Sequence, residues 1–246
     1  ELGVMVDADR FGQLLDAHDA LLLATGAQRS RPLSLPGRNL TGVLDALDFL
    51  AAVNAGSAPP LYGQHVLVLG GGDSAMDCAR SARRLGATVG VATRGDFRAS
   101  PKEIEAAREE GVELLAQHVP QSLLGSEAVE GVRFESSGTS HDLHADRVIL
   151  ALGQVPAPPA WLAAYGVALD ASGRIVVDLQ GRTAHPKLYA GGDNTRGPDL
   201  VVTAMADGRR AAESMLDTFS LSGRVRQQLH RWRPAPAAKP EPVPAG

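Results

Sequence analysis

The stretch VLVLGGGDSAMD, which begins at Val66, constrains the fold of this chain more than any other. An apolar run, three consecutive glycines and a segment of small, helix-favouring residues predict a strand, a tight turn and a helix. Gly70, Gly72 and Ala75 match the G-x-G-x-x-G/A spacing. In that pattern the first glycine permits the turn, the second lets the backbone approach a pyrophosphate, and the third small residue lets the helix pack on the strand. We therefore predict a dinucleotide bound at the start of this helix.

The end of the next expected strand indicates which dinucleotide binds. That strand, TVGVAT, is followed by Arg94, and Arg98 lies four residues further on. An NAD site usually carries an acid here, which binds the ribose 2′-hydroxyl, but no acid occurs before Asp96. Arginine suits a 2′-phosphate, so the pattern favours NADP(H). The alternative is that both arginines are surface residues without a ligand.

The depth of this unit in the chain predicts an inserted domain. Sixty-five residues precede Val66, and two further small-residue turns, Ala24–Gly26 and Ala151–Gly153, each follow an apolar run. They bracket the glycine-rich unit, so we expect the chain to leave one domain, build a second and return. The expected boundaries are a first part at 1–60, the inserted domain at 61–152, a return segment at 153–222 and a Pro-rich disordered tail at 223–246.

Hydrophobic periodicity and capping residues predict the other elements. Expected helices cover 7–17, 41–54, 74–86, 100–111 and 200–219. Expected strands cover 19–27, 65–70, 88–93, 173–178 and 187–193, and the segment 129–153 reads as returning strands joined by a turn.

A second ligand site is predicted after the last of these strands. The strand ends in Gly191–Gly192–Asp193, and a helix begins near Leu200. An acid at a strand end binds sugar-like hydroxyls, and a helix N-terminus stabilises negative charge on a ligand ring. The residues alone do not name that ligand.

Composition excludes several other classes of protein. The net charge is −4, without the basic stripe that nucleic-acid binding needs. No apolar run approaches the ~18 residues of a membrane span, and the N-terminal residues lack the features of a signal peptide, so we expect a cytoplasmic protein. Cys78 is the only cysteine, which excludes an intrachain disulfide. We expect His141 and His144, beside a Gly/Ser turn, to be surface residues rather than metal ligands.

Several of these stretches resemble the small subunit of NADPH-dependent glutamate synthase and related flavoprotein oxidoreductases, including the electron-input part of dihydropyrimidine dehydrogenase. The resemblance runs from Leu2 to about Leu216. It is carried by HDALLLATGA, GVLDALDFL, GGGDSAMDCARSARRLGA, ASPKEIEAAREEGVEL and AGGDNTRGPDLVVTAMADGRRAA. It implies an α/β, Rossmann-like three-layer FAD/NAD(P)-binding fold, in which an NADPH domain is inserted into a partial FAD domain. It also implies hydride transfer from NADPH to FAD, and onward transfer to Fe–S clusters or a partner subunit.

The resemblance also gives roles to residues at matching positions. For NADPH it implies that the pyrophosphate binds at Gly72, Asp73, Ser74 and Ala75. Arg94 and Arg98 would bind the 2′-phosphate. The path of the nicotinamide would lie near Ala151 and Gly153. For FAD it implies that the ribityl chain and the pyrophosphate bind at Gly192 and Asp193. Leu200 and Val201 would approach the flavin ring. Thr25 and Gly26 would line the adenosine side. No catalytic acid or base is expected, because hydride transfer depends mainly on the alignment of two rings.

Two departures from the family pattern qualify these expectations. Thr93 replaces the first of two adjacent arginines, which weakens the preference for NADPH without reversing it. The family's cysteine-rich Fe–S region and first FAD glycine turn do not occur in the sequence, so a missing N-terminal segment or a redox partner subunit is expected. The alternative is an NADPH-binding or docking module without turnover. A dithiol disulfide reductase of the same superfamily is strongly disfavoured, because the sequence has no pair of cysteines.

Overall fold

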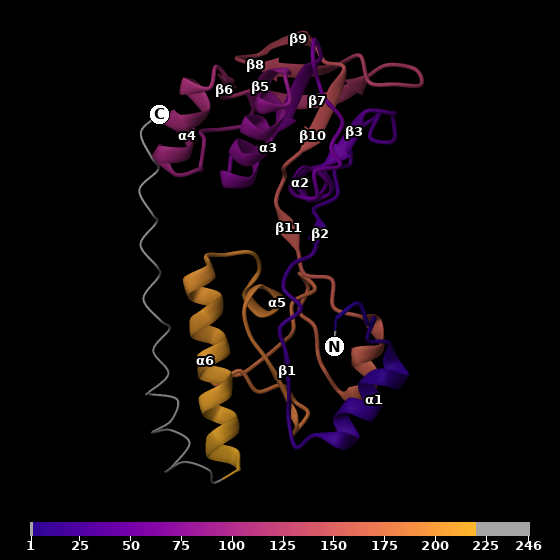
Figure 1. The fold of residues 1–246 in the computed structure, drawn as a ribbon, viewed down its shortest axis with the longest axis vertical. Coiled ribbons are helices and arrows are strands. Elements are labelled where there is room, and N and C mark those ends of the chain that lie inside the picture. The colour runs from indigo at the N-terminus through magenta and orange to yellow at the C-terminus, as the bar shows by residue number, and fades with distance from the viewer. Residues whose placement is uncertain (1, 220–246) are drawn as a thin grey trace, which may run out of the picture. The chain divides into compact units, whose positions relative to one another are not determined.

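The computed structural model describes residues 2–219, which form two compact units (Figure 1). The central unit is the continuous segment Thr25–Ala157, and the terminal unit consists of the described residues up to Ala24 and from Pro158 onward. Residues 25–60, which we expected in the first part of an FAD domain, therefore belong to the central unit. Which nucleotide each unit binds stays a prediction. The expected Pro-rich tail lies outside the described residues.

A five-stranded parallel sheet forms the middle of the central unit. Its strand order is β3-β10-β4-β5-β6, and every neighbouring pair is parallel. The order places the first glycine-rich turn after a central strand, because β4 is bordered on both sides. The strands are β3 (Val43–Asp45), β4 (His65–Leu69), β5 (Thr88–Ala92), β6 (Glu113–Leu115) and β10 (Arg147–Leu150).

Both faces of this sheet are buried, which explains the uninterrupted apolar run of β4. Val66 and Val68 face one hydrophobic cluster, and Leu67 and Leu69 face another, because successive side chains of a strand point to opposite faces. The valine face packs against helical residues such as Met76. The helices of the central unit are α2 (Ala46–Asn54), α3 (Asp73–Arg84) and α4 (Pro101–Glu109).

The leucine face is covered by a second, antiparallel sheet in the order β7-β8-β9. Val132 and Phe134 from its middle strand are fully buried against the parallel sheet. The central unit thus has three layers, which are helices, parallel sheet and antiparallel sheet, and this confirms the predicted three-layer α/β class. The strands are β7 (Val119–Leu124), β8 (Gly131–Ser136) and β9 (Thr139–His144).

A short ribbon joins the two ends of the central unit. β2 (Arg29–Ser30) pairs antiparallel with β11 (Gln154–Val155), and the two run side by side in Figure 1. A further backbone bond, from Arg31 N to Gly153 O at 3.0 Å, extends the pairing. The chain therefore enters and leaves this unit at adjacent positions.

The terminal unit is built around a parallel pair of strands, β1 and β12. Its core includes Phe11, Leu15, Leu162, Ile175 and Leu188, all buried. Its elements are α1 (Ala8–Ala17), β1 (Leu21–Leu23), the 3-10 helix η1 (Ala160–Tyr165), β12 (Leu188–Ala190), α5 (Asp193–Arg196) and α6 (Val201–Thr218), the long orange helix of Figure 1.

Two secondary-structure predictions were wrong in part. The helix expected at 41–54 begins only at Ala46, because Val43–Asp45 pairs with β10 as a strand. The strand expected at 173–178 makes only one isolated bridge, between Leu169 and Ile175. Two Asp-x-x-Gly-Arg turns, at 170–174 and 178–182, flank this segment. In each turn the backbone N–H of the aspartate donates to the carbonyl of the arginine.

Two other predictions need correction. The strand expected at 19–27 is shortened to β1, and β7 was not predicted at all, because VPQSLL has a proline and few β-branched residues. His141 and His144 do not flank the turn but lie on strand β9 beyond it. The His144 imidazole Nε2 lies 3.5 Å from the Asp146 carboxylate.

Candidate functional site

The first glycine-rich turn follows β4 and has no room for side chains at its first two positions. Gly70 has φ +148°, and a Cβ there would lie 2.2 Å from the carbonyl oxygen of Ala151. A Cβ on Gly71 would lie 2.7 Å from Oγ1 of Thr93. The turn therefore packs against the ends of two neighbouring strands, and glycine is required at both positions.

Gly72 differs from its two neighbours, because the space beside it is open. It is the N-cap residue of α3, with φ −98°, and no heavy atom lies within 4 Å of the position its Cβ would take. No side chain caps this helix end. Exposed Asp73 and Ser74 and buried Ala75 follow as the first helical residues. Free space beside an uncapped helix N-terminus fits a bound phosphate.

The loop that carries the two predicted arginines is bound to this turn through its backbone. Arg98 N and Ala99 N both donate to the carbonyl of Gly71, at 2.6 and 2.9 Å. Ser100 N donates to Oδ1 of Asp73 at 2.8 Å. The Asp73 carboxylate thus joins the start of α3 to the start of α4.

The side chains of Arg94 and Arg98 are both exposed, in the loop between β5 and α4. Within residues 2–219, no ion pair with an acid involves either guanidinium. The loop with these two arginines thus lies beside the glycine turn, and their predicted role at a 2′-phosphate stays a prediction. An anion at this loop would not compete with a protein carboxylate.

The second glycine-rich turn follows β12 in the terminal unit. Gly192 has φ +83°, and Gly191 is packed so closely that a Cβ would lie 3.2 Å from Asp207 backbone and Cβ atoms. Half-buried Asp193 begins the short helix α5. Asn194 is fully buried, and its side-chain Nδ2 donates to the carbonyl of Leu23 at 2.8 Å. The turn is therefore fixed to β1 through Asn194.

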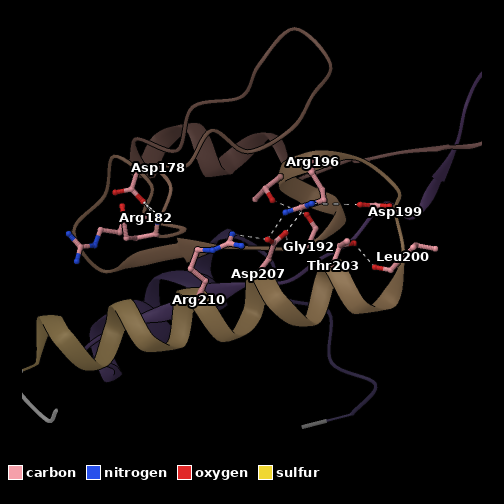
Figure 2. Close-up of polar contacts among 11 residues, drawn as sticks. Asp178, Arg182, Gly192, Arg196, Asp199, Leu200, Thr203, Asp207 and Arg210 are labelled. Atoms are coloured by element: carbon pink, nitrogen blue, oxygen red, sulfur yellow. Dashed lines mark hydrogen bonds and ion pairs between the residues drawn. The ribbon is translucent and has the colours of Figure 1, made fainter. Parts of the chain in front are cut away.

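A buried carboxylate on α6 holds the same turn from the other side (Figure 2). Asp207 is 4% exposed and accepts hydrogen bonds from Gly192 N (3.2 Å), Arg196 Nε (2.7 Å) and Nη2 (2.6 Å), and Arg210 Nη1 (2.9 Å). Burial alone would raise the pKa of Asp207, but the bonds from Arg196, Gly192 and Arg210 together outweigh it and lower the pKa below its ordinary value.

The start of α6 presents apolar side chains to solvent. Leu200 and Val201 are 64% and 75% exposed, and Val202 and Met205 beside them are exposed as well. Leu200 is the N-cap residue but provides no side-chain cap. An exposed apolar group beside uncapped backbone N–H groups fits a flat ligand that has both an apolar surface and polar edge atoms.

The four remaining predicted residues all lie in the central unit. Ala151 N donates to Leu69 O at 2.8 Å, which places Ala151 beside the first glycine turn. Gly153 is exposed with φ +92°, next to the β2–β11 ribbon. Exposed Thr25 and half-buried Gly26 are the first two residues of the central unit, whereas Gly192 belongs to the terminal unit. Their shared role at FAD stays a prediction.

Sequence reasoning missed three residues that shape the two turns, namely Gly71, Arg196 and Asp207, and it did not foresee that Thr93 packs against Gly71. Gly71 is visible in the sequence as the middle of three glycines, but the G-x-G pattern treats it as free. The contacts of Thr93, Arg196 and Asp207 join residues that are 11 to 22 positions apart in the sequence. A short sequence pattern therefore does not reveal these contacts.

Within residues 2–219, neither Cys78 nor a cluster of metal-ligand residues adds a further reactive centre. Cys78 is fully buried, with Sγ 4.0 Å from the carbonyl of Ala46, and burial raises the pKa of its thiol to about 12. Residues 2–219 contain no group of three or more His, Cys, Asp and Glu side chains placed to hold a metal ion. Over the same residues, no helix combines the length and apolar character that crossing a bilayer requires.

A glycine-rich turn between a buried parallel strand and a helix, with further strands in parallel order, defines the Rossmann-like class of dinucleotide-binding folds. More narrowly, the family model described as "Pyridine nucleotide-disulphide oxidoreductase" matches residues 7–208, and the chain belongs to this family.

The relatives that the chain resembles include glutamate synthase small chains and a putative oxidoreductase. The chain is 38% identical over 251 residues to "Glutamate synthase [NADPH] small chain" of Halomonas elongata, covering 88% of this chain and 53% of the relative. It is 39% identical over 255 residues to "Putative oxidoreductase AegA" of Escherichia coli, covering 88% of this chain and 38% of the relative. The chain thus spans about half the length, or less, of these relatives.

Solved structures agree on the fold. Thioredoxin reductase of Lactococcus lactis matches with a TM-score of 0.67 and 26% identity, over 79% of this chain and 64% of that one. FprA of Mycobacterium tuberculosis, solved in complex with NADPH, matches with a TM-score of 0.71 and 18% identity, over 90% of this chain and 70% of that one. At that identity the second likeness concerns the fold alone.

Proposed function

We propose that this chain is part of an NADPH-dependent flavoprotein oxidoreductase of the glutamate synthase small-chain type. Its central unit binds NADPH, and its terminal unit provides part of an FAD site. Electrons pass from NADPH to FAD and then to Fe–S clusters or a partner subunit. Since Cys78 is the only cysteine, the ligands of any such cluster come from outside these 246 residues.

The observation that carries the proposal is the open space beside Gly72. Gly70 and Gly71 are closed by neighbouring atoms, whereas Gly72 leaves room at the start of α3. The pyrophosphate of NADPH fits there, against backbone N–H groups and the positive end of the helix. Arg94 and Arg98, which have no acidic partner, are suited to bind its 2′-phosphate.

The terminal unit supports the flavin part of the proposal. Gly192 and Asp193 follow a buried strand, where an acid suits the hydroxyls of a ribityl chain. The apolar residues Leu200 and Val201 suit one face of a flavin ring, and the N-terminus of α6 suits negative charge on its polar edge. Hydride transfer from nicotinamide to flavin is chemistry that the cofactors supply, so these residues bind and align.

Titration of the full chain with NADPH tests the proposal through Gly72→Ala. The backbone at Gly72 suits alanine, and the added methyl group meets no protein atom, so the unfolding midpoint should not change. The methyl group would occupy the space assigned to the pyrophosphate. We expect the Kd for NADPH to rise at least about tenfold, which corresponds to ~1.4 kcal/mol.

Gly208→Ala is the matched control for this variant. Gly208 lies on α6 in the terminal unit, and its Cβ would also meet no atom within 4 Å. This change should leave NADPH binding as in the unchanged chain. Equal NADPH affinity in Gly72→Ala and the unchanged chain would overturn the assignment of the nucleotide site.

The visible absorption spectrum tests the flavin part separately. After incubation with FAD and removal of the excess, the chain should stay yellow, and NADPH should bleach the colour under anaerobic conditions. A colourless chain that still binds NADPH would refute the flavin part and favour a nucleotide-binding or docking module.

A further inference from the structure

The contacts of Asp207 link three segments that are separate in the sequence. Its two carboxylate oxygens accept four hydrogen bonds, one from the Gly192 turn, two from the end of α5 and one from within α6. Arg196, the main donor, also lies 3.6 Å from Asp199. Figure 2 shows Arg196 between these two acids, with Asp207 pointing from α6 toward the turn.

This arrangement closes the segment from Gly192 to Asp207 into a fixed loop. One end of the loop is the Gly192–Asp193 turn, and its far end leads through Leu200 into α6. The guanidinium of Arg196 is bound bidentately by Asp207, and such pairs hold a fixed geometry. Because Asp207 is almost completely buried, its charge has little solvent to replace these donors.

The backbone beside the loop is supported as well. The guanidinium of Arg174 donates from Nη1 to the carbonyl of Arg196 at 3.2 Å, and Ile175 N donates to the carbonyl of Asn194 at 2.8 Å. These bonds support the backbone of α5 without involving Asp207, and they do not reach Gly192. The backbone N–H of Gly192 therefore depends on Asp207.

We infer that Asp207 is a positioning residue for the flavin site, an inference that rests on the proposed function. It does not need to touch the flavin. By binding Gly192 N and Arg196, it sets the geometry of the Gly192–Asp193 turn relative to the apolar start of α6. These are the two parts of the terminal unit assigned to the flavin.

Hydrogen exchange on the full chain tests this inference without any cofactor. In Asp207→Asn we expect the backbone amides of residues 191–203 to exchange on the order of tenfold faster, because hydrogen bonds to a charged group are lost. Amides of β4 should keep their protection. The control is Glu213→Gln, which removes an exposed carboxylate paired with Arg209 on the same helix and should change neither region.

FAD binding by equilibrium dialysis gives the second measurement. Asp207→Asn should weaken FAD binding and leave the Kd for NADPH unchanged. If the unchanged chain binds no FAD, the flavin part of the proposed function fails, and the exchange data still decide the role of Asp207 in the turn. Unchanged exchange over 191–203 in Asp207→Asn would overturn the inference.

A second variant covers the case in which Asp207→Asn unfolds the terminal unit as a whole. Arg196→Lys keeps the positive charge but cannot make the bidentate contact. It should raise exchange over 191–203 less than Asp207→Asn and leave β12 protected. Protection of residues 191–203 equal to that of the unchanged chain would overturn the inference by itself.

Discussion

Position 71 requires glycine because of how the backbone packs there, and no reactive group is involved. Its carbonyl accepts two bonds from the loop that carries Arg98, while its missing side chain makes room for Thr93. Thr93 occupies the position where the family pattern has an arginine. The structure thus gives Thr93 a packing role against the turn, and leaves Arg94 as the exposed cation that follows β5.

Arg94→Ala should separate the two nicotinamide nucleotides. Removing an exposed guanidinium without an acidic partner should hardly affect folding, but it removes a partner of the 2′-phosphate. We expect the Kd for NADPH to rise about tenfold, or ~1.4 kcal/mol, and the Kd for NADH to change little. Fluorescence titration with each nucleotide measures both values.

Arg108→Ala is the control for this experiment, because Arg108 is an exposed arginine on α4 that pairs with Glu105. It should leave both Kd values unchanged. An equal loss of affinity for NADH and NADPH in Arg94→Ala would remove Arg94 from recognition of the 2′-phosphate.

Some residues of the site were open to prediction and others were not. Gly70, Gly72 and Ala75 follow a local spacing whose physical reason is known. The positions of Arg94 and Arg98 likewise follow from the end of the second strand. Asp207 was not predictable, because its role depends on Gly192 and Arg196, which only the folded terminal unit brings within hydrogen-bonding distance.

Among the secondary-structure elements, α4 shows how much capping residues contribute. Ser100 caps the helix through a bond from Glu103 N to its hydroxyl at 3.3 Å, and Pro101 takes the first helical position. The backbone of Ser100 is also bound to Asp73 at the start of α3. The same residue thus begins one helix and is joined to another.

Ser100→Ala should lower the free energy of unfolding by about 1 kcal/mol, the usual cost of losing a side-chain N-cap. Urea denaturation monitored by circular dichroism measures this change. Ser100→Thr keeps a hydroxyl and should recover most of the stability. If Ser100→Ala is as stable as the unchanged chain, the hydroxyl does not cap α4 in solution.

The segment 41–54 shows where element prediction failed and why. Leucines at three-residue spacing favour a helix, and the helix does form from Ala46 onward. Leu44, however, lies in a strand that pairs with Ile149, more than a hundred residues away. Local periodicity carries no information about such a distant partner, so the tertiary pairing overrides it.

At the scale of the whole molecule, the chain is divided into one continuous and one discontinuous unit. The central unit has hydrophobic clusters on both faces of its sheet. The terminal unit closes its core only when residues near Phe11 meet residues near Leu188. The two bracketing turns of the sequence, Ala24–Gly26 and Ala151–Gly153, lie near the ends of the central unit, whereas the boundary expected at residue 60 lies inside it.

The isolated segment 25–157 should therefore fold by itself. We expect one cooperative urea transition and a Kd for NADPH within about twofold of the full chain, because every element of the predicted nucleotide site in this unit is retained. Introducing Gly72→Ala into the fragment should abolish most of this binding. A fragment without a cooperative transition would show that the central unit depends on the terminal one.

The pairing of β2 with β11 has a consequence for how such genes are assembled. Neighbouring strands lie roughly 5 Å apart, so the central unit begins and ends within the span of an ordinary surface hairpin. Every helix and strand of the terminal unit lies outside this segment of the chain. A gene can therefore gain or lose the whole central unit at one position without interrupting the code for any element of the terminal unit.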